Sequence, residues 1–348
     1  MDLVIERTEL ATLKAPPALA TVRGIVNGFK EFQVLLAGYG SGLFDWLEAN
    51  GPAEKATIGA ALNLRGAHLG AFLQVLEDLG LLAREATAYT LPVGMKEALA
   101  ASSPWCQAAT LEALLVSSNG WADMQAFMTE GWPPKTWQAP QTLALHPFLT
   151  EAQQLAAALA SRSGQGCGGA ALKTLLCFDG GDGLLAAALC QRFPELRAEV
   201  VVAPGAQQRT EKALLECDVA ERCQVLVGTP LDSVTHETFD KVVLFHSLYP
   251  VRKFMTDALA AAAARLAPGG ELCCAHWFCL EACESAPGGL RDLDKAVLTD
   301  SHPLCGVEKF CQRLEDAGLI GAERADLAGD FGNTKLHFAR RPGGGRGC

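Results

Sequence analysis

The chain has 348 residues, of which 49% are hydrophobic, so it can bury a sizeable core and form about two domains. Its 29 Lys and Arg residues against 39 Asp and Glu residues give a net charge of -10, and such a surface repels nucleic-acid phosphates. No apolar run reaches the roughly 18 residues of a membrane span, and the N-terminal MDLVIERTEL lacks the pattern of a signal peptide. We therefore expect a cytoplasmic protein that binds neither nucleic acid nor a membrane.

The segment 1–145 is predicted to be a mostly helical domain. Between residues 22 and 48, apolar residues recur at three- and four-residue steps, which is the spacing of one helix face. Gly38, Gly40 and Gly42 interrupt this pattern in its middle. The pattern therefore predicts either one broken helix or two helices.

The next part of this domain has the order of elements found in a winged helix. A short helix over 57–62, a longer helix over 69–79 and a two-stranded hairpin within 81–92 are predicted in succession. The longer helix carries Glu77 and Asp78, whereas a DNA-reading helix needs basic residues. We therefore expect this unit to serve dimerisation or to cover a substrate rather than to bind DNA.

A second domain is predicted over 146–342, after a segment rich in proline and tryptophan at 132–140. Apolar strands alternate with helices there, which predicts an α/β, Rossmann-like domain with a parallel sheet and helices on both faces. The predicted strands cover 173–178, 198–202, 224–227, 241–245, 271–276 and, as an antiparallel terminal hairpin, 321–326 and 335–340; the helices cover 184–193, 208–217, 253–266 and 307–317. Residues 343–348 are predicted to be a flexible tail.

The 13 cysteines are odd in number and mostly lie in apolar runs, which indicates buried reduced thiols rather than a disulfide framework. A local group of possible ligands matches no zinc-site spacing, so no metal site is expected. Its members are Cys273, Cys274, His276, Cys279 and Cys283. A reactive thiol is an alternative at Cys177, because that residue comes just before a predicted helix N-terminus. A small buried side chain is the interpretation that we favour there.

The sequence CFDGGDG at 177–183 joins the first strand of the predicted sheet to the helix that follows it. In a doubly wound fold, ligands bind beyond the carboxyl ends of the strands, and a glycine turn there lets the backbone approach a cofactor. The candidate cofactor-binding residues in this turn are Asp179, Gly180, Gly181, Asp182 and Gly183. The turn lacks the lysine and the serine or threonine of a phosphate-binding loop, so a nucleoside triphosphate is not expected. A tight turn without a ligand is the alternative.

The whole chain resembles the class I S-adenosylmethionine (SAM)-dependent O-methyltransferases of the acetylserotonin, caffeate and polyketide-tailoring type. The resemblance is carried by NGFKEFQVLLAGYGSGLFDWLEANGP in the first domain, and by TLLCFDGGDGLLAAALCQRFPEL and VLFHSLYPVRKFMTDALAAAAARLAPGGEL in the second. In this family a winged-helix dimerisation domain precedes a Rossmann-like domain. The resemblance therefore implies a homodimer with SAM as its cofactor and a small molecule bearing a hydroxyl or thiol as its methyl acceptor.

The resemblance also implies roles for residues around the expected crevice. His246 matches the histidine that acts as general base on the acceptor, and a neutral imidazole suits that role near pH 7. His276 and Leu304 lie where plant members have carboxylates beside that histidine, so His276 is a second catalytic candidate. The aromatic side chains expected to line the acceptor pocket are Phe245, Tyr249 and Trp277.

Several positions depart from the family pattern. Cys177 and Asp179 replace an acidic residue and the first glycine of the family's loop, and a side chain at position 179 is expected to crowd the methionine part of the cofactor. Val202 and Ala203 replace the carboxylate that binds the ribose hydroxyls, and Thr229 replaces an aspartate near the adenine. Each lost charge-assisted contact costs about 1.5 to 3 kcal/mol. Two interpretations follow: a methyltransferase with a histidine base, or a methyltransferase-fold protein that has lost normal SAM binding and serves as a non-methylating enzyme or a binding or regulatory dimer.

Overall fold

The computed structural model describes residues 10–129, 140, 142–163, 172–232, 235–278, 288–299, 304–329 and 332–343 of the chain. The chain forms two compact units, Met1–Leu114 and Leu115–Cys348, each with its own hydrophobic core. Residues 115–145, which we expected in the first domain, fall in the second unit by this division. Among the described residues, no helix is both long enough and apolar enough to span a membrane.

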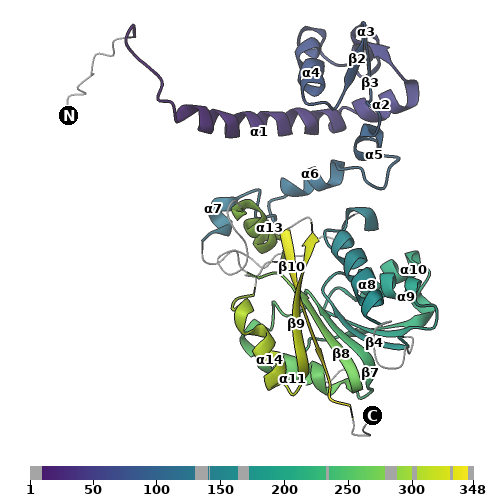
Figure 1. The fold of residues 1–348 in the computed structure, drawn as a ribbon. Coiled ribbons are helices and arrows are strands. Elements are labelled where there is room, and N and C mark those ends of the chain that lie inside the picture. Colours follow the sequence, from purple (N-terminus) through teal and green to yellow (C-terminus); the bar gives the residue numbers. More distant parts are fainter. Residues whose placement is uncertain are drawn as a thin grey trace. The chain divides into compact units, whose positions relative to one another are not determined.

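The first unit begins with a long helix, α1 (Leu19–Gly40), which is followed by α2 (Leu43–Asn50) (Figure 1). The interruption predicted from the glycines lies at Gly42, whose φ of 71° is strained for residues with a side chain. The segment is therefore two helices rather than one. Phe44 and Leu47 of α2 are buried in the core of this unit, and the C-terminal half of α1 packs against it.

The rest of the first unit consists of short elements. They are β1 (Ala53–Glu54), α3 (Lys55–Ala61), α4 (Gly66–Asp78), β2 (Ala83–Glu85), β3 (Ala88–Thr90), α5 (Met95–Leu99) and α6 (Ala108–Leu114). Strand β3 pairs antiparallel with both β1 and β2. Leu69, Leu73 and Leu76 form the buried face of α4. The two helices and the hairpin follow the predicted order, and the winged-helix assignment itself stays a prediction.

The second unit is built on a seven-stranded sheet of order β6-β5-β4-β7-β8-β10-β9, which confirms the predicted α/β fold class. The strands are β4 (Thr174–Asp179), β5 (Arg197–Val202), β6 (Cys223–Val227), β7 (Phe239–Phe245), β8 (Leu266–His276), β9 (Ile320–Gly329) and β10 (Gly332–Arg340). Strands β4 to β8 are parallel, and β10 pairs antiparallel with β8 and β9. The strand order reverses between β4 and β7, where ligands bind in sheets of this kind.

Helices cover both faces of this sheet (Figure 1). The helices of the second unit are α7 (Met124–Phe127), α8 (Leu149–Ser163), α9 (Leu184–Arg192), α10 (Gln207–Glu216), α11 (Met255–Ala264), α13 (Gly289–Thr299) and α14 (Phe310–Asp316). Helix α9 packs between α8 and α10, while α11 packs against α14 and β8. The loop 180–183 joins the carboxyl end of the central strand β4 to the N-terminus of α9.

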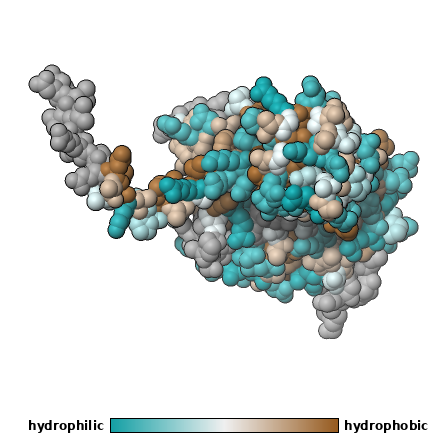
Figure 2. Space-filling model, turned by 90° about the horizontal axis from the view of Figure 1, so that it is seen from above, coloured by the Kyte–Doolittle hydropathy of each residue, from teal (hydrophilic) through white to brown (hydrophobic). Residues whose placement is uncertain are grey.

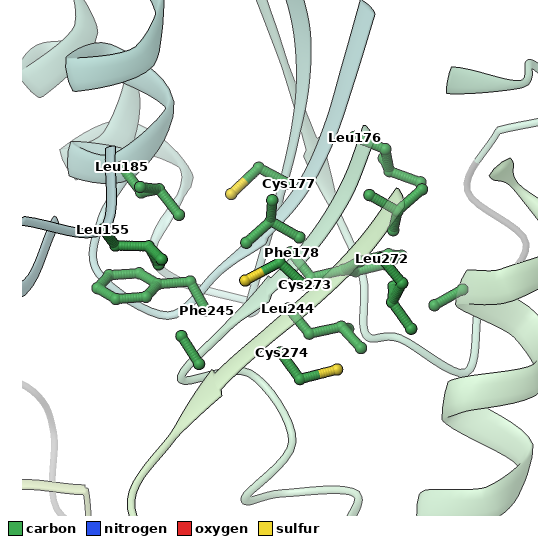
Figure 3. Close-up of a cluster of buried hydrophobic side chains, with 14 of the residues drawn as sticks. Leu155, Leu176, Cys177, Phe178, Leu185, Leu244, Phe245, Leu272, Cys273 and Cys274 are labelled. Carbon is green, nitrogen blue, oxygen red and sulfur yellow. The ribbon is translucent and has the colours of Figure 1, made fainter. Parts of the chain in front are cut away.

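Buried cysteines of β4 and β8 fill part of the core of the second unit (Figure 3). Burial raises the pKa of the thiols of Cys177, Cys273 and Cys274, for Cys273 to about 12. A thiol that stays protonated is a poor nucleophile. The raised pKa therefore favours the interpretation of Cys177 as a buried, unreactive side chain. Cys177, Cys273 and Cys274 are free thiols, and within the described ranges no group of three or more potential ligands could hold a metal. Cys279 and Cys283 lie outside the described residues.

Candidate active site and cofactor crevice

The carboxyl ends of β4, β7 and β8 bring most of the predicted site residues together. The glycine loop follows β4, His246 follows β7, and His276 ends β8. The rings of His246 and His276 have their centres 6.1 Å apart. Strand pairing between β4 and β7 and between β7 and β8 explains this convergence, because parallel neighbours end at the same edge.

The glycines of the loop are in close contact with the protein itself. The amide of Gly180 donates to the carbonyl oxygen of Phe245 at 2.7 Å, and a Cβ at position 180 would lie 2.5 Å from the carbonyl oxygen of His246. Gly183 has a φ of 85°, and a Cβ there would lie 2.8 Å from Thr210 on α10. Packing between β7, the loop and α10 therefore requires these glycines even without a ligand.

The carboxyl group of Asp179 is turned into the loop. Asp179 is only 3% exposed, and its Oδ1 accepts a hydrogen bond from the amide of Gly181 at 2.7 Å. The Cys177 thiol lies 3.7 Å from Oδ2. Burial raises the pKa of Asp179, against the lowering effect of the amides of Gly181 and Ala186. The carboxyl group thus satisfies backbone donors of the loop and is not directed into solvent.

Asp182 is paired instead with a residue that the sequence did not point to. Arg209, in the first turn of α10, donates to both of its carboxylate oxygens at 3.0 and 3.1 Å and to the carbonyl oxygen of Gly205 at 2.9 Å. The His146 ring lies 3.6 Å from the same carboxylate. Burial acts to raise the pKa of Asp182, but His146 and Arg209 outweigh it and the pKa is lowered. This ion pair bridges the glycine loop and α10.

The three positions expected to bind the ribose and the adenine carry no carboxylate. Val202 is buried at the end of β5, and Ala203 follows it. The amide and hydroxyl groups of Thr229 both donate to Asp232, at 2.6 and 2.9 Å. Asp232 therefore caps the turn after β6, and this role occupies one of its oxygens.

His246 is the centre of a buried polar network. Its Nε2 lies 2.6 Å from Oε2 of Glu151 on α8, and its Nδ1 lies 2.7 Å from the hydroxyl of Tyr249. The Trp277 indole donates to the other oxygen of Glu151 at 3.0 Å, and the Phe148 ring stacks on the imidazole with centres 4.4 Å apart. The side chains of His246 and Glu151 are each 1% exposed. Both ring nitrogens of the predicted base are therefore occupied.

The hydrogen bonds around Tyr249 assign the protons in this network. The Tyr249 oxygen accepts the amide proton of Trp277 at 2.9 Å, so its own proton is free to be donated to Nδ1 of His246. Nε2 then donates to Glu151. Burial acts to raise the pKa of Glu151, but the charge and hydrogen bond of His246 outweigh it, and the pKa is lowered. In neither protonation state does the imidazole present an unused lone pair.

His276 holds the turn that follows β7. Its Nε2 accepts hydrogen bonds from the amides of Ser247 and Leu248, both at 3.1 Å. Burial, followed by the charge of His246, lowers the pKa of His276 well below its ordinary value. A ring that accepts two amide protons and stays neutral is suited to fixing a backbone turn. The amide of Leu304, at the neighbouring predicted position, donates to the carbonyl oxygen of Trp277 at 3.0 Å.

The aromatic residues predicted to line an acceptor pocket are all buried. Phe245 and Trp277 have no exposed surface and Tyr249 is 4% exposed. Phe148 packs against both Phe245 and Trp277, with ring centres 5.9 and 5.2 Å apart. Their role in binding an acceptor stays a prediction, since their contacts here are with one another.

A small pocket lies elsewhere in the second unit. It measures about 80 Å³, below the roughly 300 to 1,000 Å³ of typical ligand pockets. Its lining comes from β4, α11 and the connection after β6, and includes Phe178, Pro230 and Arg265. None of the predicted catalytic residues lines it.

Glu151, Arg209 and His146 are site residues that the sequence analysis missed. A signal for Glu151 was present, because it interrupts the apolar stripe of α8 next to Ala152 and four residues before Leu155. A carboxylate on a buried helix face needs a partner of opposite charge or several donors. The sequence could indicate that need, but it could not identify His246 as the partner.

No protein-family model matches this chain, and no curated protein matches it by sequence. Its fold matches solved structures over nearly the whole length. An O-methyltransferase family protein from Burkholderia thailandensis is 19% identical with a TM-score of 0.75, covering 95% of this chain and 100% of its own. PigF with SAH, the demethylated form of SAM, is 17% identical (TM-score 0.67; 94% and 100%), and human N-acetylserotonin methyltransferase in complex with SAM is 19% identical (0.62; 94% and 99%). The chain therefore has the fold of the SAM-dependent O-methyltransferases.

The residues at the carboxyl edge do not fit SAM in the manner that the resemblance implies. The Asp179 carboxyl group already holds the Gly181 amide, and Arg209 reaches across the loop to Asp182. At the end of β5, Val202 and Ala203 offer no acceptor side chain for a ribose diol. Among the described residues, the carboxylates of Asp179 and Asp182 are thus bonded to the protein, and the end of β5 lacks the carboxylate that the family uses.

Proposed function

We propose that this chain is a non-methylating member of the methyltransferase fold and acts as a homodimeric binding or regulatory protein. The observation that carries this proposal is the His246 network, in which Glu151 and Tyr249 occupy both ring nitrogens at 2.6 and 2.7 Å. A general base needs a free lone pair within hydrogen-bond reach of the acceptor. A ring with a 1% exposed side chain and two internal partners does not meet that condition.

The proposal predicts that the full chain does not bind SAM or SAH. Isothermal titration calorimetry with either ligand at up to about 1 mM is expected to give no saturable heat, because several polar contacts worth about 1.5 to 3 kcal/mol each are lost. A dissociation constant below about 100 µM for either ligand would contradict it. Methyl transfer from SAM to a small molecule would contradict it as well.

SAM-dependent methyl transfer to a small-molecule hydroxyl or thiol, with His246 as base, is the second candidate. It is favoured by the match of the fold over 95% of the chain to an O-methyltransferase family protein. It also agrees with the position of the glycine loop beyond β4, at the switch in strand order. This candidate requires the contact between His246 and Glu151 to open, and the same titration separates it from the first.

The proposal of a homodimer is based on exposed apolar residues in the N-terminal half of α1. Val22, Ile25, Val26 and Phe29 repeat at helical spacing and are 54%, 73%, 47% and 63% exposed. Figure 2 shows hydrophobic surface on this segment. An exposed apolar stripe of this length on a helix is typical of a surface that a partner covers. We propose a second copy of the chain as that partner.

Replacing Phe29 with aspartate is expected to convert the dimer to a monomer, because a carboxylate would be buried in the apolar contact. Sedimentation velocity over a range of concentrations measures the change. Glu31→Lys is the matched control, since Glu31 is exposed and two residues further along the helix, on its other side. A wild-type chain that sediments as a monomer at every concentration would exclude the dimer.

A further inference from the structure

The glycine loop presents backbone donors to a carboxylate that the chain itself supplies. Amides at the N-terminus of a helix and in a glycine turn form a site for anions. Here the Gly181 amide donates to Oδ1 of Asp179 at 2.7 Å, and the amide of Ala186, in the first turn of α9, also stabilises the charged form of this carboxyl group. The donors that an anionic ligand would use are thus engaged by Asp179.

The position of Asp179 is costly without such donors. It is the last residue of β4, it follows the buried Phe178, and it is itself only 3% exposed. Burial and the nearby charge of Asp182 both raise its pKa. A glycine or an apolar residue would avoid these effects, so the compensating amides are what allow a carboxyl group here.

Asp182 does not take the same place. Its two oxygens are held by Arg209 at 3.0 and 3.1 Å, on the side of the loop that faces α10. The two acidic residues of the loop therefore have separate partners. Asp179 is bound by the backbone, and Asp182 is bound by a side chain.

We propose that Asp179 is a built-in occupant of the loop's anion site and stands where the carboxylate of an amino-acid ligand such as SAM or SAH would bind. This inference rests on the proposed function, since it gives the physical reason why the chain does not bind these ligands. The carboxyl group excludes them because it fills the space next to the Gly181 amide and takes the hydrogen bond of that amide.

Removing the carboxyl group is expected to restore binding. Calorimetric titration with SAH compares the wild-type full chain with Asp179→Gly and Asp179→Ala, and we expect both variants to bind with a dissociation constant of about 100 µM or less, against no saturable heat for the wild type up to about 1 mM. Asp179→Asn keeps an oxygen acceptor for the Gly181 amide, so its gain is expected to be much smaller. Circular dichroism melting identifies any variant that does not fold. If one of the glycine and alanine variants fails to fold, the other still tests the inference.

Asp240 provides a matched control. It accepts hydrogen bonds from the amides of Lys173 and Thr174 at 3.1 and 3.0 Å, at the opposite end of β4. Asp240→Asn removes a charge from a similar backbone contact and is expected to leave SAH binding unchanged.

The outcomes separate this inference from the proposed function. Tight SAH binding by the wild type would overturn both. Folded Asp179→Gly and Asp179→Ala variants that bind no better than a non-binding wild type would overturn the role of Asp179 and leave the proposed function standing. An equal gain in Asp179→Asn would also overturn it, because charge alone would then account for the exclusion.

Discussion

Replacing Glu151 with alanine is expected to lower the free energy of unfolding by about 3 to 5 kcal/mol. The substitution removes a buried carboxylate and leaves Nε2 of His246 and the indole of Trp277 without their acceptor. Both donors are buried, so water cannot replace the lost carboxylate. Urea unfolding followed by circular dichroism and tryptophan fluorescence measures the loss.

A second glutamate provides the control for this measurement. Glu323 pairs with Arg162 at 3.1 Å, but its side chain is 62% exposed. Glu323→Gln is therefore expected to change the free energy of unfolding by less than about 1 kcal/mol. If Glu151→Ala costs no more than Glu323→Gln, the His246 network is not a stabilising element.

Stability is expected to fall as the pH is lowered from about 6.5 to 4. Burial, followed by the charge of Arg324, lowers the pKa of His337 to about 4, and burial lowers that of His276 well below 6.5. Over this range these two histidines bind protons in the unfolded chain but not in the folded chain. The stability that they contribute is therefore fully present above their unfolded pKa of about 6.5, and it is lost as the pH falls toward their folded pKa. For His337 alone the shift corresponds to about 3 kcal/mol.

Urea unfolding at a series of pH values tests this expectation. His337→Gln removes one of the two groups and is expected to flatten the decline in stability between pH 6.5 and 4. His68→Gln, at an exposed position of the first unit, is the matched control and is expected to leave the slope unchanged. A decline of the same steepness in the wild type and in His337→Gln would assign it to other groups.

The buried network and the glycine loop share one consequence for function. At the edge of the sheet where a ligand would bind, the side chains of several predicted site residues bond to other side chains or to the backbone. His276 holds the turn after β7, Glu151 holds His246, and Asp179 holds the loop. A methyltransferase fold is thus retained while the groups expected to serve its chemistry act as internal supports.

Local patterns in the sequence were sufficient for most of the elements. The alternation of apolar strands with helices predicted the parallel sheet, and CFDGGDG marked the turn between β4 and α9. The glycines after residue 37 predicted the interruption that lies at Gly42. These features depend on neighbouring residues, because periodicity and left-handed backbone conformations are local properties. The resemblance to a known family added the expected positions of the site.

The partners of the site residues could not be read in the same way. Glu151 and His246 are 95 residues apart in the sequence, and α8 and β7 meet only when the sheet and its helices pack. Asp179 was expected to lie against a ligand, whereas its carboxyl group is turned into the loop and accepts the hydrogen bond of the Gly181 amide. Whether a histidine or an aspartate is free or bonded depends on contacts across elements, which are formed by packing and leave no pattern along the chain.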